Sequence, residues 1–222
     1  MRGAVILLRA AATATAVLGL ILLWLMPATP VTANTPGFTG AVVGFELASE
    51  PGHVFGILGG PGAPERAEAV RRMDLGNRID FLFMIAYPLL FVGIARLLAA
   101  SGHLRGGLGW VALLLPVLMT LGDALENRQL LVLSQTVDAA AMAGPLAALG
   151  VFTRLKWYPI FAESALLAPF VWRETGWWRW SAPVFGLAGL LGLVSVVHLP
   201  AIETGASVLG VAWLMTLVRS WQ

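Results

Sequence analysis

Two carboxylic acids and an amide interrupt an apolar stretch of this chain, in the sequence Thr-Leu-Gly-Asp-Ala-Leu-Glu-Asn over residues 120–127. Asp123 and Glu126 are three residues apart and Asp123 and Asn127 are four apart, so a helix places all three on one face. Acids are costly near lipid and usually bind, relay or react with something there. Because neighbouring buried acids can hold one carboxyl protonated while the other is ionised, we interpret Asp123 and Glu126 as a catalytic acid–base pair. Asn127 then contributes to substrate binding.

The helix that we expect to carry this group spans residues 107–125. The acids therefore lie at its C-terminal end, where the helix dipole disfavours negative charge. Such a group needs a cation, a proton or a substrate to balance it. The simpler alternative is a helix end that water solvates, with the guanidinium of Arg128 as the partner of the acids.

Asp80 and Tyr87 form a second candidate pair. They are seven residues apart, which puts them on one stripe of a helix with Tyr87 two turns deeper, and a carboxylate near a phenol can carry out acid–base chemistry. Asn77 followed by Asp80 also resembles a capping box that opens a helix. In that alternative Asp80 is structural, and Tyr87 is a packing residue beside Pro88.

Asp138 is the last catalytic candidate, and its role depends on where its helix begins. If the helix starts near Gln129, Asp138 lies about 13 Å along it and must face a cavity or another polar group. If the helix starts near Ser134, Asp138 is an ordinary acid of the first turn.

Three further residues are candidates for substrate binding, because the expected topology puts them on the same side of the membrane as the acids. Glu46 lies on a short apolar helix. That helix either folds over the acids or lies at the membrane surface with Glu46 on its polar edge. His198 and Glu203 flank the turn between the last two expected spans.

Lys156 is the only lysine of the chain. We expect it to be an anchor whose ammonium extends to the inner membrane surface. Glu163 is expected either to line a re-entrant segment or to pair with Lys156 or Arg154.

Composition limits the chemistry further. The chain has no cysteine, which excludes disulfides, thiol catalysis and cysteine-ligated metals. None of the three histidines has a second histidine at metal-binding spacing. No motif of the sequence requires a cofactor. In one variant of the lipid-enzyme hypothesis, the acidic oxygens bind a Mg²⁺ ion that holds a phosphorylated lipid headgroup.

The composition predicts an all-α, polytopic membrane protein. Hydrophobic residues make up 58% and charged residues 12% of the 222 positions, whereas a soluble domain carries about 25% charged residues. Several uncharged runs approach the about 20 residues needed to cross a bilayer. Most of the chain lies in such runs, so we expect a single membrane domain over residues 1–222. The net charge of +2, without a basic stripe, gives no indication of nucleic-acid binding.

We predict about six transmembrane spans, with a long outer connection over residues 27–78 that contains short interfacial helices. A surface helix is expected over residues 64–73, with Glu68 paired to Arg72 and Gly76 at its end. The first span also resembles a secretory signal peptide with a cleavage site near Ala33. The spans are residues 10–26, 79–99, 107–125, 129–152, 180–199 and 201–218.

Residues 158–172 decide the number of spans. If they cross the membrane, the chain has seven spans; if they are re-entrant or interfacial, it has six and both termini face the cytoplasm. The six-span alternative puts nine of the fourteen basic residues inside, as the positive-inside rule favours. Thirteen arginines against one lysine indicate GC-rich codon usage, so we expect the inner membrane of a bacterium.

Three functions are compatible with these residues. The preferred one is an acid–base enzyme in the membrane, an isomerase, cyclase or hydrolase, that acts on a lipid or isoprenoid-like substrate from the outer leaflet. The second is a transporter or channel coupled to protons or cations, although the expected topology gathers the acids on one side instead of along a path. The third is a non-catalytic lipid-binding or assembly subunit. Membrane lipids are the expected partners in all three, and a hydrophobic small molecule is the expected substrate of the first.

Overall fold

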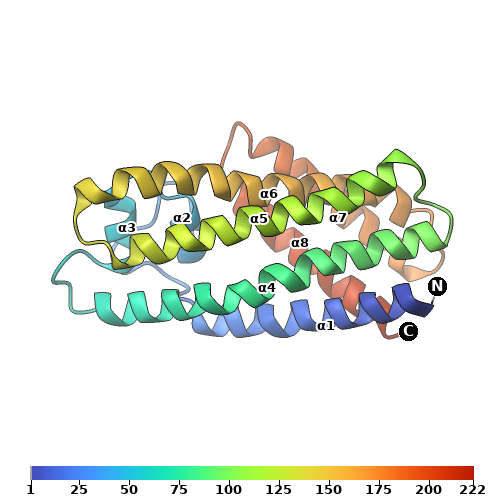
Figure 1. The fold of residues 1–222 in the computed structure, drawn as a ribbon, viewed down its shortest axis with the longest axis horizontal. Coiled ribbons are helices and arrows are strands. Elements are labelled where there is room, and N and C mark those ends of the chain that lie inside the picture. The colour runs from blue at the N-terminus through green and yellow to red at the C-terminus, as the bar shows by residue number, and fades with distance from the viewer. Residues whose placement is uncertain (1) are drawn as a thin grey trace. The chain divides into compact units, whose positions relative to one another are not determined.

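The computed structural model describes residues 2–222, and every regular element in that range is a helix (Figure 1). This confirms the all-α prediction. The elements follow in the order α1 (Arg2–Leu25), α2 (Ala41–Glu46), α3 (Pro51–Leu58), α4 (Arg66–Ala100), α5 (Gly107–Gln135), the 3₁₀ helix η1 (Ala139–Met142), α6 (Ala143–Val171), the 3₁₀ helix η2 (Trp177–Trp180), α7 (Ser181–Val194) and α8 (Ala201–Ser220).

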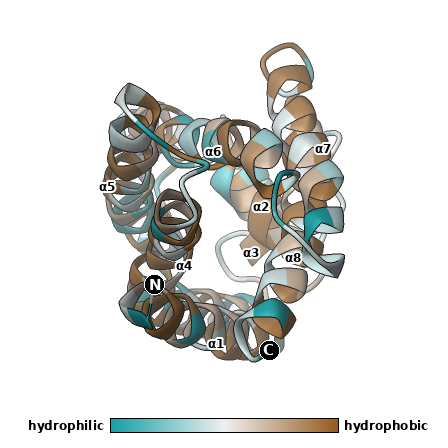
Figure 2. Cartoon of the chain, turned by 90° about the vertical axis from the view of Figure 1, so that its right-hand side faces the viewer, coloured by the Kyte–Doolittle hydropathy of each residue, from teal (hydrophilic) through white to brown (hydrophobic). Residues whose placement is uncertain are grey.

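Four of these helices, α1, α4, α5 and α8, are long and apolar enough to cross a membrane. Large hydrophobic side chains are exposed along them, among them Trp24, Trp110 and Leu214. Figure 2 shows mainly hydrophobic residues on α1 and α5. So much exposed apolar surface suits lipid and not water, and the chain is a multi-pass membrane protein. Helix α6 carries several charged residues and α7 has only 14 residues, so the count of six crossings stays a prediction.

The chain divides into two compact units, each built from separate stretches of sequence. The first unit contains residues 2–17, Phe83–Thr120 and Trp157–Gln222. The second unit contains Leu18–Leu82 and Leu121–Lys156. The boundaries fall inside helices, so α1, α4, α5 and α6 each contribute to both units.

The second unit has a hydrophobic core in which α2 and α3 pack against α5 and α6. The long connection between α1 and α4 is therefore folded structure. Helix α2 is mostly buried, so the alternative that places it at the membrane surface is wrong. Its Phe45 is fully buried, and the core also contains Ala41, Val54, Ile57, Leu130, Leu133, Leu146 and Leu149.

Helix α4 is continuous from Arg66 to Ala100, so the predicted break at Gly76 is wrong. Gly76 serves a different purpose: a Cβ at this position would overlap the side chain of Met26. Glycine here lets the end of α1 approach the backbone of α4. Asn77 is buried in the interior of the helix. It is therefore not the N-cap of a capping box.

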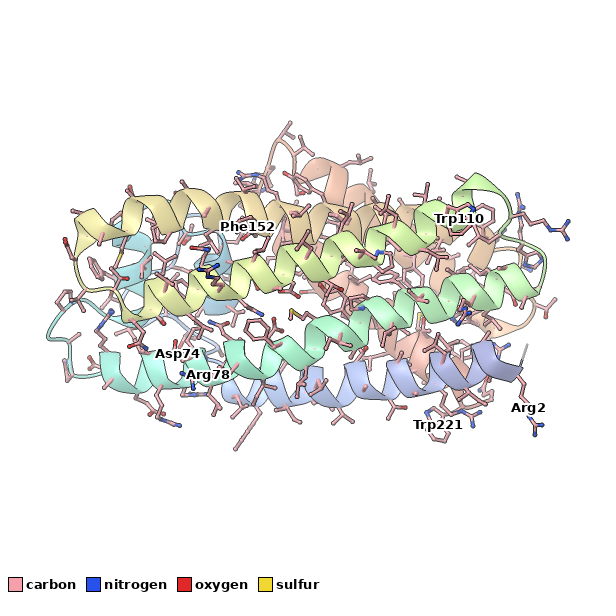
Figure 3. The ribbon with its side chains drawn as sticks, in the orientation of Figure 1. Arg2, Asp74, Arg78, Trp110, Phe152 and Trp221 are labelled. Atoms are coloured by element: carbon pink, nitrogen blue, oxygen red, sulfur yellow. The ribbon has the colours of Figure 1, made fainter. Side chains whose placement is uncertain are left out.

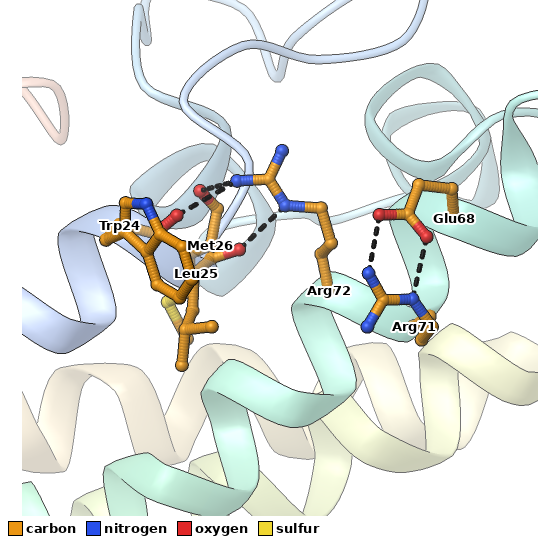
Figure 4. Close-up of polar contacts among 6 residues, drawn as sticks. All are labelled: Trp24, Leu25, Met26, Glu68, Arg71 and Arg72. Atoms are coloured by element: carbon orange, nitrogen blue, oxygen red, sulfur yellow. Dashed lines mark hydrogen bonds and ion pairs between the residues drawn. The ribbon is translucent and has the colours of Figure 1, made fainter.

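Arg72 closes the C-terminal end of α1, where a helix leaves its last carbonyl groups without intrahelical partners. The contact is drawn in Figure 4. The predicted pair between Glu68 and Arg72 is wrong, since Glu68 pairs with Arg71 at 2.7 Å on the exposed side of α4. The guanidinium of Arg72 donates hydrogen bonds to the carbonyl oxygens of Trp24, Leu25 and Met26.

Helices α5 and α6 are longer than the sequence predicted. Helix α5 continues from the predicted end at Leu125 to Gln135. Helix α6 passes without a break through residues 153–157 and contains Pro159 and Pro169. Residues 158–171 are thus the second half of α6 and not a separate re-entrant segment. The turn between the two helices lies at residues 136–142.

The first unit contains the close pair of helices α7 and α8 and the second half of α6. Close packing of α7 on α6 depends on glycine, because a Cβ at Gly189 would lie 2.6 Å from the Cβ of Ala165. Gly176 has a φ of 76°, a left-handed conformation that favours glycine, and it lets the chain turn from α6 into η2.

Candidate functional site

Lys156 lies near the middle of α6, with its ammonium group buried among carboxylates. Its Nζ is 2.9 Å from Oε1 of Glu46 and 3.6 Å from Oδ1 of Asp123, and it donates a hydrogen bond to Oε1 of Glu126. Only 5% of the residue is exposed. A buried ammonium has lost its solvation by water, and it needs partners of this kind to compensate.

Helix α5 supplies three of the polar groups, and the face they share is the one that the spacing predicts. Asp123, Glu126 and Asn127 are all buried. Asn127 Nδ2 donates to Oδ2 of Asp80 on α4 at 2.6 Å. One face of α5 therefore bonds α6 through Lys156 and α4 through Asp80.

The approach of α5 to α6 depends on Gly122. A Cβ at this position would lie 2.5 Å from the backbone nitrogen of Lys156 and 2.6 Å from the carbonyl carbon of Leu155. Both are backbone atoms of the neighbouring helix and cannot rotate away. Gly122 thus brings the turn that holds Asp123 against the turn that holds Lys156.

Glu46 reaches the cluster from the short helix α2. Thr153, one turn before Lys156 on α6, donates its hydroxyl hydrogen to the backbone carbonyl oxygen of Glu46 at 2.8 Å. Phe45 is buried in the core of the second unit. These two contacts fix the end of α2, so the Glu46 carboxylate is directed at the ammonium of Lys156.

The resulting group contains more acids than bases. We call it the Lys156 cluster; its members are Lys156, Glu46, Asp80, Asp123, Glu126 and Asn127. Three carboxyl groups contact one ammonium, and a fourth, that of Asp80, joins the group through Asn127. Of the four acids only Asp80 is partly exposed. Excess negative charge in a buried environment is neutralised by protons or a cation. Among residues 2–222 there is no group of three or more acidic or histidine side chains with metal-binding geometry.

The other predicted site residues lie elsewhere. Asp138 is exposed at the start of η1, where its carboxylate accepts a hydrogen bond from the backbone N–H of Ala140 at 2.9 Å. It caps a turn, so the alternative of a deeply buried acid is wrong. Tyr87 belongs to the first unit and stacks on Trp213 with ring centres 5.7 Å apart. His198, which is exposed, lies in the turn before α8, and Glu203 lies in the first turn of α8; both belong to the first unit.

Lys156 is the candidate site residue that the sequence interpretation missed. The expected anchor at the membrane surface is wrong, and Lys156, not Arg128, is the ion-pair partner of the α5 acids. One signal was present: a chain that otherwise uses arginine keeps a single lysine inside an apolar stretch. A compact ammonium fits between carboxylates where a broad guanidinium does not.

Glu163 is a second buried acid, and it belongs to the first unit. The expected pair with Lys156 or Arg154 is wrong, because both carboxyl oxygens of Glu163 lack a hydrogen-bond partner within residues 2–222. Arg154 instead donates to the carbonyl oxygen of Gly150. The residue is fully buried. An acid of this kind is a candidate for a stored proton.

A further polar contact joins α4 to the end of α5. Asp74, labelled in Figure 3 one turn before Arg78, accepts hydrogen bonds from Ser134 Oγ and Gln135 Nε2, each at 2.5 Å. Beside it lies a shallow pocket of ≈ 320 Å³ lined by Arg66, Val70, Ser134 and other residues of these two helix ends. None of its lining residues belongs to the Lys156 cluster.

The chain was compared with protein families, curated proteins and solved structures. No protein-family model, no curated protein and no solved structure matches the chain.

Proposed function

We propose that this protein is a multi-pass membrane protein that works by binding and releasing protons at the Lys156 cluster, and that it couples this exchange to the movement of a small solute. The observation that carries the proposal is the set of three carboxyl groups in contact with one buried ammonium, together with a fourth, Asp80, that is bonded to Asn127 of the same group. Intramembrane acids of this kind are typical of proton relays in transporters.

Access to the cluster favours protons over a bulky substrate. Four residues of the cluster are at most 8% exposed, namely Glu46, Asp123, Glu126 and Lys156. A lipid could reach them only after the helices separate, whereas a proton can pass along hydrogen bonds. Asp80 is partly exposed and is bonded to Asn127, so it supplies a route by which protons enter.

The acid–base enzyme remains the second candidate, because the same groups could protonate or deprotonate a lipid or isoprenoid. Neighbouring carboxyl groups, of which one is protonated and one ionised, are the arrangement that general acid–base catalysis uses. Asp123 and Glu126 would then act on the substrate, with Asp80 and Asn127 in support. Mg²⁺ is not part of either proposal.

The orientation that we propose places both termini in the cytoplasm. In the first unit, Arg9 donates to the carbonyl oxygen of Ser220, and His103 pairs with Glu174. These contacts gather the start of α1, the α4–α5 turn and the ends of α6 and α8. An excess of arginine marks the cytoplasmic side, and the arginines at this end are Arg2, Arg9, Arg96, Arg105, Arg173, Arg179 and Arg219.

Proteoliposomes that contain a trapped pH-sensitive dye test the proposed coupling. Amino acids, sugars and hydrophobic amines are added in turn to the wild type and to the Lys156→Met and Glu126→Gln variants. We expect one solute class to drive proton movement in the wild type and neither variant to respond. Arg71→Gln, which changes an exposed ion pair outside the cluster, is the matched control and should behave as the wild type.

Two outcomes would contradict the coupling. Solute uptake that is unchanged by Lys156→Met would show that the cluster is not involved. Conversion of a membrane lipid by the wild type, lost in an Asp123→Asn/Glu126→Gln double variant and detected by mass spectrometry, would establish the enzyme in its place.

A further inference from the structure

A guanidinium group of the first unit is enclosed by two indole rings. The Cζ of Arg179, on η2, lies 4.4 Å from the ring centre of Trp172 and 5.9 Å from that of Trp180. The two rings meet edge to face, with centres 5.2 Å apart. Contacts of a cation with an aromatic face are favourable and fix the orientation of the guanidinium.

Two more arginines lie beside aromatic rings in the same region. The Cζ of Arg219, at the end of α8, is 6.0 Å from the ring centre of Trp178. Arg173, at the end of α6, has its Cζ 5.4 Å from the ring of Phe170. Helix α8 and η2 contact each other, so these groups belong to one surface. We call it the arginine–tryptophan surface; it consists of Trp172, Arg173, Trp178, Arg179, Trp180 and Arg219.

None of the three guanidinium groups of this surface has a carboxylate partner among residues 2–222. Glu174, the acid next to Arg173, instead accepts hydrogen bonds from Ser101 Oγ at 2.7 Å and pairs with His103 at 2.9 Å. The Nε of Arg179 is buried without a hydrogen-bond partner in the described chain. Three positive charges are therefore held in place without a protein counter-ion.

The surroundings of these charges suit a lipid headgroup. Trp172 and Trp180 are 42% and 59% exposed, and exposed tryptophan is enriched where a bilayer meets water. Guanidinium groups bind phosphate oxygens through paired hydrogen bonds. An occupant that combines an anionic phosphate with an apolar body satisfies both the arginines and the exposed indole rings.

We propose that the arginine–tryptophan surface binds the headgroup of an anionic phospholipid. The site lies in the first unit and uses none of the residues of the Lys156 cluster. It is thus independent of the proposed proton coupling, and either proposal can fail without the other. A soluble phosphate would satisfy the arginines but would leave the indole rings in contact with water, which is why the lipid is the better occupant.

Native mass spectrometry of the full chain in a neutral detergent tests this binding. Phosphatidylglycerol and phosphatidylcholine with the same acyl chains are titrated separately, and the bound lipids are counted. The wild type should bind phosphatidylglycerol at least about tenfold more tightly, since each arginine near an anionic lipid contributes about fivefold in affinity.

Substitutions locate the site. Arg173→Gln, Arg179→Gln and Arg219→Gln should each weaken phosphatidylglycerol binding by about fivefold and leave phosphatidylcholine binding unchanged. Arg179→Lys retains the charge but loses the planar stack on Trp172, so it should recover only part of the affinity. Arg71→Gln removes an arginine that is paired with Glu68 and should bind as the wild type. The melting temperature and elution volume of every variant are compared with those of the wild type, so that unfolding is not mistaken for lost binding.

Three results would overturn the proposal. Equal affinity of the wild type for the two lipids would show that the surface does not select anionic headgroups. Full retention of binding by the folded triple glutamine variant would place the lipid elsewhere. Displacement of the lipid by an excess of inorganic phosphate would identify the surface as a site for soluble anions.

Discussion

The ammonium of Lys156 links α6 to α2 and α5 through the carboxylates of those two helices, and its removal should therefore be costly. Lys156→Met leaves Glu46, Asp123 and Glu126 facing one another without a cation. Breaking a buried pair by removal of one partner typically destabilises a protein by about 3–5 kcal/mol. We expect a loss of this size in the free energy of unfolding, measured by denaturant titration in detergent.

A double variant separates the pairing from the loss of the lysine itself. Glu126→Gln removes one of the competing negative charges, so Lys156→Met/Glu126→Gln should be more stable than the sum of the two single losses predicts. Arg71→Gln, at an exposed pair, should cost no more than about 1 kcal/mol. Purely additive losses would show that Lys156 and Glu126 are not energetically coupled.

Replacement of Glu163 should stabilise the protein, whereas replacement of Lys156 should destabilise it. A buried polar group without a partner costs about 1–3 kcal/mol, so Glu163→Leu, which fills a similar volume with apolar atoms, should raise the free energy of unfolding by an amount in this range. Glu163→Gln keeps polar atoms in the same place and should bring little gain. If the leucine variant is instead less stable than the wild type, then Glu163 has a bonded partner in the membrane.

At the scale of helices, the contact between α5 and α6 is set by the absence of a side chain. Gly122→Ala adds a Cβ against the backbone of Leu155 and Lys156. Overpacking of this kind costs about 1–3 kcal/mol, and the helices must separate at the turn that carries Asp123. We expect both a loss of stability and a loss of proton exchange, detected as altered carboxyl bands in infrared spectra recorded at different pH values.

Gly109 on the same helix is the matched control for Gly122. Nothing lies within 4 Å of a Cβ placed there. Gly109→Ala should therefore stabilise the protein by about 0.5–1 kcal/mol, because alanine loses less backbone entropy than glycine in a helix. Equal destabilisation by the two substitutions would mean that helix packing at Gly122 is not the cause.

The sequence was informative about helices and less so about their ends. Apolar runs and helical spacing predicted an all-helical membrane protein and the common face of Asp123, Glu126 and Asn127. The acids Asp123 and Glu126 favour a helix end near Leu125, because acids in lipid are unfavourable. That inference failed because the compensating charge, Lys156, comes 30 residues after Glu126. Such a pairing between distant residues leaves no trace in local periodicity.

The position of the short helix α2 could not be predicted either, because it also depends on residues that are distant in the sequence. Its apolar residues are compatible with a membrane surface or with a protein core, and the choice depends on α5 and α6, which follow much later in the chain. Only their assembly places Phe45 in a core and Glu46 beside Lys156. Gly76 is likewise ambiguous, since a glycine that ends a helix and one that admits a neighbouring helix look alike in a sequence.

At the scale of the whole molecule, the proposed orientation can be tested because the chain has no cysteine of its own. Single cysteines are introduced at Ser101, Thr175, Glu65 and Val137. A thiol reagent that does not cross membranes should label Glu65→Cys and Val137→Cys in intact cells, and Ser101→Cys and Thr175→Cys only after permeabilisation. The reverse pattern would invert the topology, and labelling of Ser101→Cys and Thr175→Cys from different sides would exclude it.

The length of α4 has a practical consequence. At 1.5 Å per residue its 35 residues extend about 52 Å, against a hydrocarbon layer of about 30 Å. Arg72 bonds the last carbonyl groups of α1, so the turns of α4 before Arg72 extend past the end of that helix, with Glu68 and Arg71 exposed. We expect these turns to extend into water and to offer a helical epitope. An antibody fragment raised against them would give this 23.5 kDa protein a marker outside the detergent micelle, large enough to align particle images in electron cryomicroscopy.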